Sequence, residues 1–83
     1  MDEDRSGVVD PGRAMYVYVQ VADDVAARIA DGGLRAGARL PGERDLAETY
    51  GVAVRTARRA VQELRERGLV VTLAAKGSFI AEQ

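Results

Sequence analysis

A single glycine between two amphipathic segments is the feature that most constrains the fold of this chain. Tyr50-Gly51-Val52 separates a segment that begins near Pro41-Gly42 from one that runs from about Ala53 to Arg67. Glycine readily adopts the left-handed backbone conformation that ends a helix, so one residue is enough to redirect the chain. Two helices joined by so short a turn containing glycine predict a helix-turn-helix unit.

A four-residue apolar repeat predicts another helix, from about Met15 to Ala30. Its apolar positions are Val17, Val21, Ala22, Val25, Ala26 and Ile29. This spacing places the apolar side chains on one helix face. Gly32-Gly33 ends the helix. Arg39-Leu40 should be extended and form a very short strand, because a residue before proline, here Pro41, avoids helical backbone angles.

The segment that follows Gly51 combines an apolar face with a cationic one. The apolar face contains Val52, Ala57, Ala60, Val61 and Leu64. The other side contains Arg55, Arg58, Arg59, Gln62 and Arg65. After Gly68, two short strands are expected at Leu69 to Leu73 and Ser78 to Ala81, joined by a turn at Ala74 to Gly77. The expected fold is mainly α with a small β-hairpin, a three-helix winged helix-turn-helix.

The core should be mostly aliphatic, because the chain contains only three Tyr and one Phe. Tyr16, Tyr18 and Tyr50 are expected to pack within the protein and not to stack on nucleic-acid bases. Phe79 and Ile80 are expected in the core, since a hairpin of two short strands is stable only when it packs on other elements.

The chain length of 83 residues is enough for one small domain. We assign this domain to residues 13–83. Residues 1–12 are acidic, contain Pro11 and two glycines, and lack a periodic apolar pattern. They are therefore predicted to be a disordered acidic tail.

The composition argues against an enzyme. The chain has no Cys and no His, which removes thiolate metal sites and the usual general base. We expect no catalytic residues, no metal site and no cofactor. No apolar run approaches the roughly 20 residues that a membrane-spanning helix needs, and the polar N-terminus is not a secretion signal. A cytoplasmic, nucleoid-associated protein without membrane contact is therefore expected.

The charge is unevenly distributed, although the net charge is only −1. Residues 1–33 contain three Arg and seven acidic residues, whereas residues 34–83 contain nine basic and six acidic residues. Five Arg lie between Val52 and Gly68. A basic segment of this kind is typical of a nucleic-acid-binding surface, and an ordinary solvated helix face is the alternative.

Several short motifs occur in an order that resembles a known family. They are Tyr18-Val19-Gln20-Val21-Ala22-Asp23, Gly33-Leu34, Gly37, Leu40-Pro41-Gly42-Glu43-Arg44-Asp45-Leu46-Ala47, Gly51-Val52, Thr56, Arg58-Arg59-Ala60, Leu64, Gly68-Leu69-Val70 and Gly77-Ser78-Phe79-Ile80. Together they resemble the N-terminal DNA-binding domain of the GntR family of transcription regulators, over about residues 13 to 83.

The resemblance implies that Arg44 contacts DNA. At the start of its helix Arg44 could reach a phosphate or a base edge, or instead pair with Glu48 one turn later. Arg58 is the strongest candidate for base recognition, because an arginine on a recognition helix can bind guanine through two hydrogen bonds. The alternative for Arg58 is a phosphate contact. Arg59 lies beside it and is also assigned to the DNA-binding surface.

Four further residues are assigned to the same surface. Arg55 lies one turn before Arg58 and either contacts DNA or is solvated. Thr56 lies near the helix start, where a hydroxyl and free amides can hold a phosphate, or it caps the helix. Lys76-Gly77 at the hairpin tip can approach the minor groove, unless Gly77 only forms the turn.

Some positions depart from the family pattern. Gly42 stands where the family usually has Ser or Ala. Ala53-Val54 stands where it usually has Ser or Thr followed by Arg, and Val54 could instead touch a thymine methyl group. Thr72 and Leu73 occupy wing positions that are often basic, and Ala75 replaces the first wing glycine. These differences predict altered specificity and fewer phosphate contacts, and therefore a shallower salt dependence.

We therefore expect a sequence-specific DNA-binding transcription regulator, with repression as the expected mode. Its recognition helix, at about residues 53–67, would lie in the major groove of an operator, and its wing, at residues 74–77, near the minor groove. A second copy of the chain is a candidate partner. No effector-binding domain of the kind found in the family is expected within these residues. The alternative is a winged-helix protein-interaction module with little DNA affinity.

Overall fold

The reversal at Gly51 is present in the computed structural model, which describes residues 4–82 of the chain. Helix α2 spans Glu43–Tyr50 and helix α3 spans Val54–Glu66. Gly51 lies between them with φ +66° and ψ +39°, the left-handed conformation. Its successor Val52 donates a backbone hydrogen bond to the Ala47 carbonyl (3.0 Å), which closes the turn. The predicted helix-turn-helix unit is confirmed.

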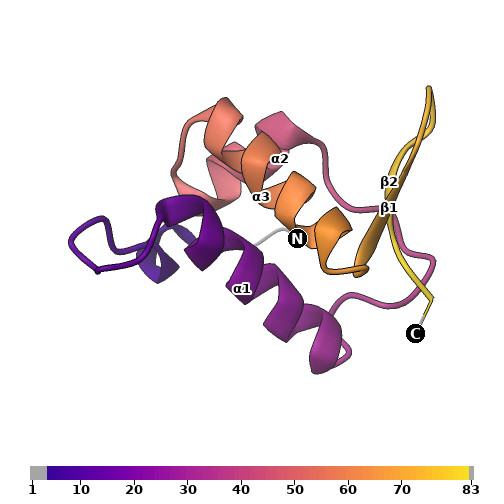
Figure 1. Cartoon of the computed structure of the whole chain (residues 1–83), viewed down its shortest axis with the longest axis horizontal. Helices are drawn as coiled ribbons and strands as arrows, with labels where there is room; N and C mark the ends of the chain where they lie inside the picture. Colours follow the sequence, from indigo (N-terminus) through magenta and orange to yellow (C-terminus); the bar gives the residue numbers. More distant parts are fainter. Residues whose placement is uncertain (1–3, 83) are drawn as a thin grey trace.

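Helix α1 spans Val17–Ala30 and packs against α3, which in turn packs against α2 (Figure 1). The buried core is aliphatic apart from Tyr50. It consists of Val21, Ala22, Val25, Leu34, Leu40, Leu46, Ala47, Tyr50, Ala57, Ala60, Val61, Leu64, Val70 and Ile80. Within α1 and α3 they belong to the predicted apolar faces. The remaining core residues come from α2, from the connection between α1 and α2, and from each strand, which contributes one. Burial of this surface is the main driving force that holds the three helices together.

The hairpin consists of β1, Val70–Leu73, and β2, Gly77–Ile80, which pair antiparallel with Val70 opposite Ile80 and Leu73 opposite Gly77. The short strand expected before Pro41 is a single bridge between Arg39 and Phe79. Only the base of the hairpin is anchored in the core, and its turn projects from the body of the domain (Figure 1). The expected fold class, mainly α with a small hairpin, is confirmed.

The segment of residues 4–10, here called the N-terminal strap, differs from the expected disordered tail. It contains a short 3-10 helix, η1, at Ser6–Val8. The backbone N–H of Arg5 donates to the Thr49 carbonyl (2.7 Å), and Asp10 exchanges hydrogen bonds with the side chain of Gln20. The strap is thus held by polar contacts to distant residues, which no apolar periodicity reveals. Residues 1–3 lie outside the described residues, and the domain boundary at residue 13 stays a prediction.

Two expectations about aromatic residues need correction. Tyr16 was expected to pack, but it precedes α1 and its relative exposure is 78%. Its ring stacks on that of Tyr18, with 5.9 Å between the centroids. Phe79 is only half-buried, whereas Ile80 is in the core as expected. Tyr16 lies before the first residue of α1, where the adjacent elements do not cover it. Phe79 alternates with Ile80 along β2, so its side chain points to the face opposite the core.

Candidate nucleic-acid interface

The first turn of α2 presents Arg44 to solvent. The backbone at Gly42 is extended, and α2 begins at Glu43. Within residues 4–82 Arg44 forms no ion pair, so the alternative of a pair with Glu48 is not realised. Arg44 instead borders a surface hollow of about 360 Å³ that the first residue of α3, Val54, also lines. The guanidinium is therefore available beside the start of α3.

Arg58 projects from the second turn of α3 toward the start of α2. Its Nε donates a hydrogen bond to Glu43 Oε1 at 3.1 Å, and its side chain remains 63% exposed. A bond through Nε leaves both terminal nitrogen atoms of the guanidinium to donate to another acceptor. Glu43 thus orients Arg58 without occupying the whole guanidinium.

The start of α3 carries Arg55 and Thr56 without a side-chain cap. The N-cap residue is Ala53, whose side chain has no acceptor for the first amides of the helix. Arg55 is exposed and forms no ion pair within the part of the chain that the structure describes. Uncapped amides and the positive end of the helix dipole favour an anion at this position.

The side chain of Arg59 is held by contacts to other residues of the protein. Its guanidinium lies 4.2 Å from the centroid of the Tyr18 ring, and Nη2 donates to the Tyr18 hydroxyl at 3.2 Å. It also forms ion pairs with Glu66 at 3.4 Å and Glu63 at 3.9 Å. These contacts fix the side chain toward α1 and the end of α3. Arg59 is therefore less available to a ligand than the other predicted cations.

The turn of the hairpin places Lys76 in solvent. The Lys76 backbone N–H donates to the Leu73 carbonyl at 3.0 Å, which closes the turn. Gly77 follows with φ +113°, a conformation that favours glycine, and Ala75 has φ +64°. The turn requirement at Gly77 is therefore real, and Ala75 adopts a conformation that costs a residue with a Cβ roughly 1–2 kcal/mol.

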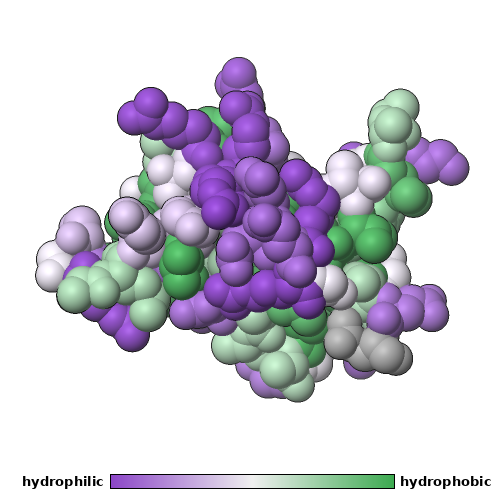
Figure 2. Space-filling view, viewed as in Figure 1, coloured by the Kyte–Doolittle hydropathy of each residue, from purple (hydrophilic) through white to green (hydrophobic). Residues whose placement is uncertain are grey.

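Hydrophilic side chains gather over α2 and α3 on one face of the molecule, whereas apolar residues predominate on the body of the hairpin (Figure 2). A second hollow on the described surface, of about 300 Å³, places Tyr16 and Tyr18 beside Arg55, Thr56 and Arg59. The start of α1 therefore adjoins the start of α3.

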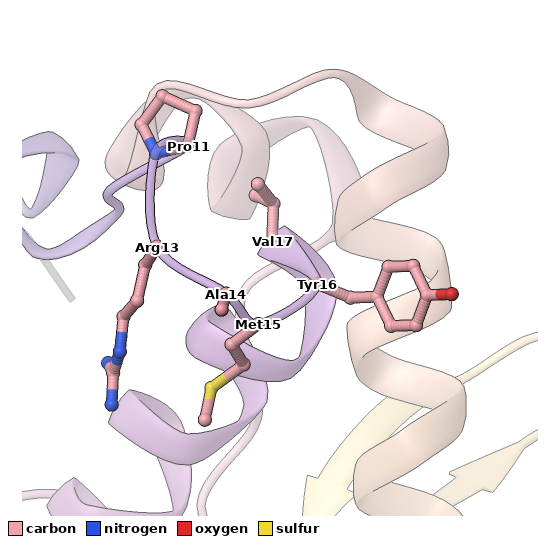
Figure 3. A pocket seen from close by; sticks show the side chains of 6 residues that line it. All are labelled: Pro11, Arg13, Ala14, Met15, Tyr16 and Val17. Atoms are coloured by element: carbon pink, nitrogen blue, oxygen red, sulfur yellow. The ribbon is translucent and has the colours of Figure 1, made fainter.

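A further hollow, of about 460 Å³, lies at the start of α1 (Figure 3). Residue 11 and residues 13–17 line it, and Arg13 is the only charged residue among them. Tyr16 points away from the other lining side chains (Figure 3). A loop hollow with a single cation and no carboxylate contains no general acid–base pair.

A partly buried polar cluster links the N-terminal strap, α1 and α2. The Tyr50 hydroxyl donates to Asp24 Oδ2 at 2.7 Å, and Arg5 binds the same carboxylate through Nε and through Nη2, the latter at 2.8 Å. Burial by itself raises the pKa of Asp24, but the hydrogen bonds from Arg5 and Tyr50 outweigh it, so this pKa is lowered. Burial, followed by the bond to Asp24, raises the pKa of Tyr50. Both groups therefore keep their ordinary charge at neutral pH.

The family model for bacterial regulatory proteins of the gntR family matches residues 17–80. This chain belongs to the GntR family. Among its relatives are the transcriptional regulator SmoD of Agrobacterium fabrum, 38% identical over 83% of this chain, and the transcriptional repressor NagR of Bacillus subtilis, 32% identical over 80%. The chain spans 30% of the length of SmoD and 27% of NagR.

Among solved structures, the DNA-binding domain of AraR in complex with operator ORX1 superposes with a TM-score of 0.78. It is 27% identical, and the match covers 87% of this chain and 89% of the AraR domain. The GntR chain described here is therefore a winged helix-turn-helix domain of a transcription regulator. Its relatives are regulators and not enzymes, which agrees with the expectation from composition.

The sequence interpretation of this GntR domain missed the partners of its arginines. Glu43 is 15 residues from Arg58, and Tyr18 is 41 residues from Arg59. Local spacing rules extend only to the next helix turn, so they cannot reveal such pairs. Among the described residues no cluster of His, Cys, Asp and Glu could hold a metal ion. None of the described helices is long and apolar enough to cross a membrane.

Proposed function

We propose that this domain binds a double-stranded DNA operator sequence-specifically, with α3 in the major groove and the hairpin turn near the minor groove. The observation that supports the proposal is that some cations of the domain form ion pairs within the protein whereas others do not. Arg44, Arg55 and Lys76 have no ion-pair partner within residues 4–82, and Arg58 keeps two free nitrogen atoms. Free guanidinium groups on one surface bind phosphates and guanine edges.

The roles of the individual residues follow from their positions. Arg58 reads a base edge in the major groove, and Arg55 and Thr56 hold a phosphate at the uncapped start of α3. Arg44 contacts the backbone beside them. Lys76 and Gly77 approach the minor groove. Arg59 contributes indirectly, because its contacts to Tyr18 and Glu63 fix the orientation of α3 on α1.

Repression by occupancy of a palindromic operator is the proposed mode. NagR, one of the relatives, is named as a repressor, and two copies of the domain on two half-sites would supply affinity that one copy lacks. Such a regulator acts in the cytoplasm, associated with the nucleoid. These statements concern the domain and would extend to any longer protein that contains it.

The decisive experiment selects bound duplexes from a random pool and sequences them. We expect an enriched motif, and a palindromic motif would support binding by two copies. If no duplex is retained even at low salt, the proposal is contradicted and the protein-interaction alternative is favoured.

The enriched duplex then tests Arg58. The Arg58→Ala change should weaken binding to it about 5- to 150-fold, which corresponds to ~1–3 kcal/mol, and should weaken binding to a scrambled duplex much less. Fluorescence anisotropy at fixed salt measures both. Arg35→Ala is the matched control, because Arg35 is an exposed arginine of the connection between α1 and α2, outside α2, α3 and the hairpin. An equal loss on both duplexes would assign Arg58 to a phosphate.

A further inference from the structure

Arg39, which the sequence interpretation did not assign to the DNA-binding surface, lies along the hairpin. Its backbone bridges Phe79, with Leu40 N–H bonded to the Ser78 carbonyl (2.9 Å) and Ile80 N–H to the Ala38 carbonyl (2.8 Å). Residues 38–40 thus lie beside β2, joined to it by this single bridge and its two flanking hydrogen bonds. From this position the Arg39 side chain extends along the hairpin toward its turn.

The Arg39 guanidinium rests on the backbone of Gly77. A Cβ built on Gly77 would lie 3.1 Å from Nε, 3.1 Å from Nη2 and 3.4 Å from Cζ of Arg39. The space that any other residue would fill is therefore occupied by the guanidinium. Gly77 has two reasons to be glycine: its φ of +113° and the arginine that covers it.

The charge of Arg39 is not neutralised by the protein. Within residues 4–82 it forms no ion pair, and the residue is exposed. Arg39 and Glu43 both line a hollow of about 260 Å³, but Oε1 of the Glu43 carboxylate accepts a hydrogen bond from Arg58. Lys76, which precedes Gly77, adds a second positive charge at the hairpin turn. Arg39 and Lys76, neither of which forms an ion pair within residues 4–82, together favour an anionic ligand.

The hairpin otherwise carries little charge. Positions 72 and 73 are Thr and Leu, and the free end of the hairpin lies on the same side of the molecule as α2 (Figure 1). Lys76 is the only charged residue of the hairpin, and Arg39 adds a second positive charge at this end from a different segment of the chain. Its planar fork of donors suits a phosphate.

We propose that Arg39 contacts a DNA phosphate beside the wing. Gly77, which has no side chain, leaves the space in which the Arg39 guanidinium lies. This inference rests on the proposed DNA-binding function and extends it to a residue outside α2, α3 and the hairpin. The wing then contacts DNA with Arg39 and Lys76 together.

The first test measures the affinity of the full chain for the selected duplex and for a scrambled duplex between 50 and 200 mM salt. Arg39→Ala should weaken binding to both by a similar factor, about tenfold at low salt. It should also lower the slope of log affinity against log salt by about one. Arg35→Ala, four residues away on the same connection, should leave the slope unchanged.

Several results would overturn the inference. An unchanged slope and affinity in Arg39→Ala, while the wild-type chain binds, would remove Arg39 from the interface and leave the proposed function intact. Failure of the wild-type chain to bind any duplex would instead contradict the proposed function. A loss of thermal stability without a change in slope would assign Arg39 a structural role only.

A double-mutant cycle tests whether the packing of the Arg39 guanidinium on Gly77 contributes to DNA binding. Gly77→Ala should weaken binding by a larger factor in the wild-type chain than in the Arg39→Ala chain, because only in the wild-type chain does it also displace the Arg39 guanidinium. Equal losses in both backgrounds would show that Gly77 acts through its backbone conformation alone. Arg39→Lys should keep the salt slope but recover only part of the affinity, since the charge remains and the fork is lost.

Discussion

The two sides of this domain use arginine in opposite ways. Behind the helix-turn-helix, Arg5 binds Asp24, and Arg67 joins α3 to α1 through Glu63 (2.9 Å) and Asp23 (2.8 Å). On the DNA-binding side, Arg55 and Lys76 have no carboxylate partner within the described residues, and Arg58 uses only its Nε to bind Glu43.

This difference distinguishes arginines that stabilise the fold from arginines that are available to a ligand. An arginine partly buried between two elements, such as Arg5, fixes those elements through its carboxylate partner, and loss of the partner leaves a partly desolvated charge. An arginine in solvent adds little to stability, but it retains its charge for an external anion. The residue type is the same on both sides, and the neighbouring carboxylates decide its role.

The largest expected effect is on the paired side. Asp24→Asn should lower the free energy of unfolding by about 2 kcal/mol, because it removes the charge that Arg5 and Tyr50 both contact. Urea unfolding followed by circular dichroism measures the change. DNA affinity of the folded variant should stay within about twofold of wild type.

Tyr50→Phe is the matched control for this change. It removes one hydrogen bond to Asp24 but keeps the ion pair with Arg5, so a loss of about 1 kcal/mol is expected. If Tyr50→Phe lowered the free energy of unfolding as much as Asp24→Asn, the ion pair with Arg5 would contribute nothing to stability. The distinction between paired and unpaired arginines would then be wrong.

The same cluster predicts a pH dependence. Because the folded-state pKa of Asp24 is lowered, its stabilisation is fully present above the unfolded Asp pKa of about 3.9 and is lost as pH falls through the folded value. The difference in unfolding free energy between wild type and Asp24→Asn should therefore be constant from about pH 7 to 5 and shrink below about pH 4. A constant difference down to about pH 2 would contradict this assignment.

Arg44 tests the unpaired side. Arg44→Ala should leave the unfolding free energy within about 0.5 kcal/mol of wild type. It should lower the slope of log affinity against log salt by about one, because one phosphate contact is lost. Salt titrations of DNA binding provide the measurement. A clear loss of stability with unchanged DNA binding would place Arg44 with the paired arginines.

The smallest effect is expected at Ala75. Its φ of +64° is strained for alanine, so Ala75→Gly should raise the unfolding free energy, by at most about 1 kcal/mol, since the flexibility of glycine in the unfolded chain offsets part of the gain. Thermal unfolding detects it. A decrease in stability would show that the hairpin turn does not need this conformation.

The sequence by itself determined the backbone plan of this protein. Gly51 sets the reversal between α2 and α3, and the apolar repeat of α1 sets its buried face, because both depend on neighbours within a few residues. The positions of Arg44, Arg55 and Arg58 on exposed helix faces follow from the same local periodicity.

Only the tertiary structure decided which cations remain free. The strap reaches Asp24 across 19 residues, Arg58 reaches Glu43 across 15, and Arg59 reaches Tyr18 across 41. Such pairs form because packing brings separate elements together. The type of a charged residue does not indicate which distant residue it will contact. For the same reason Arg39, in a connecting segment, becomes part of the wing only when its backbone pairs with β2.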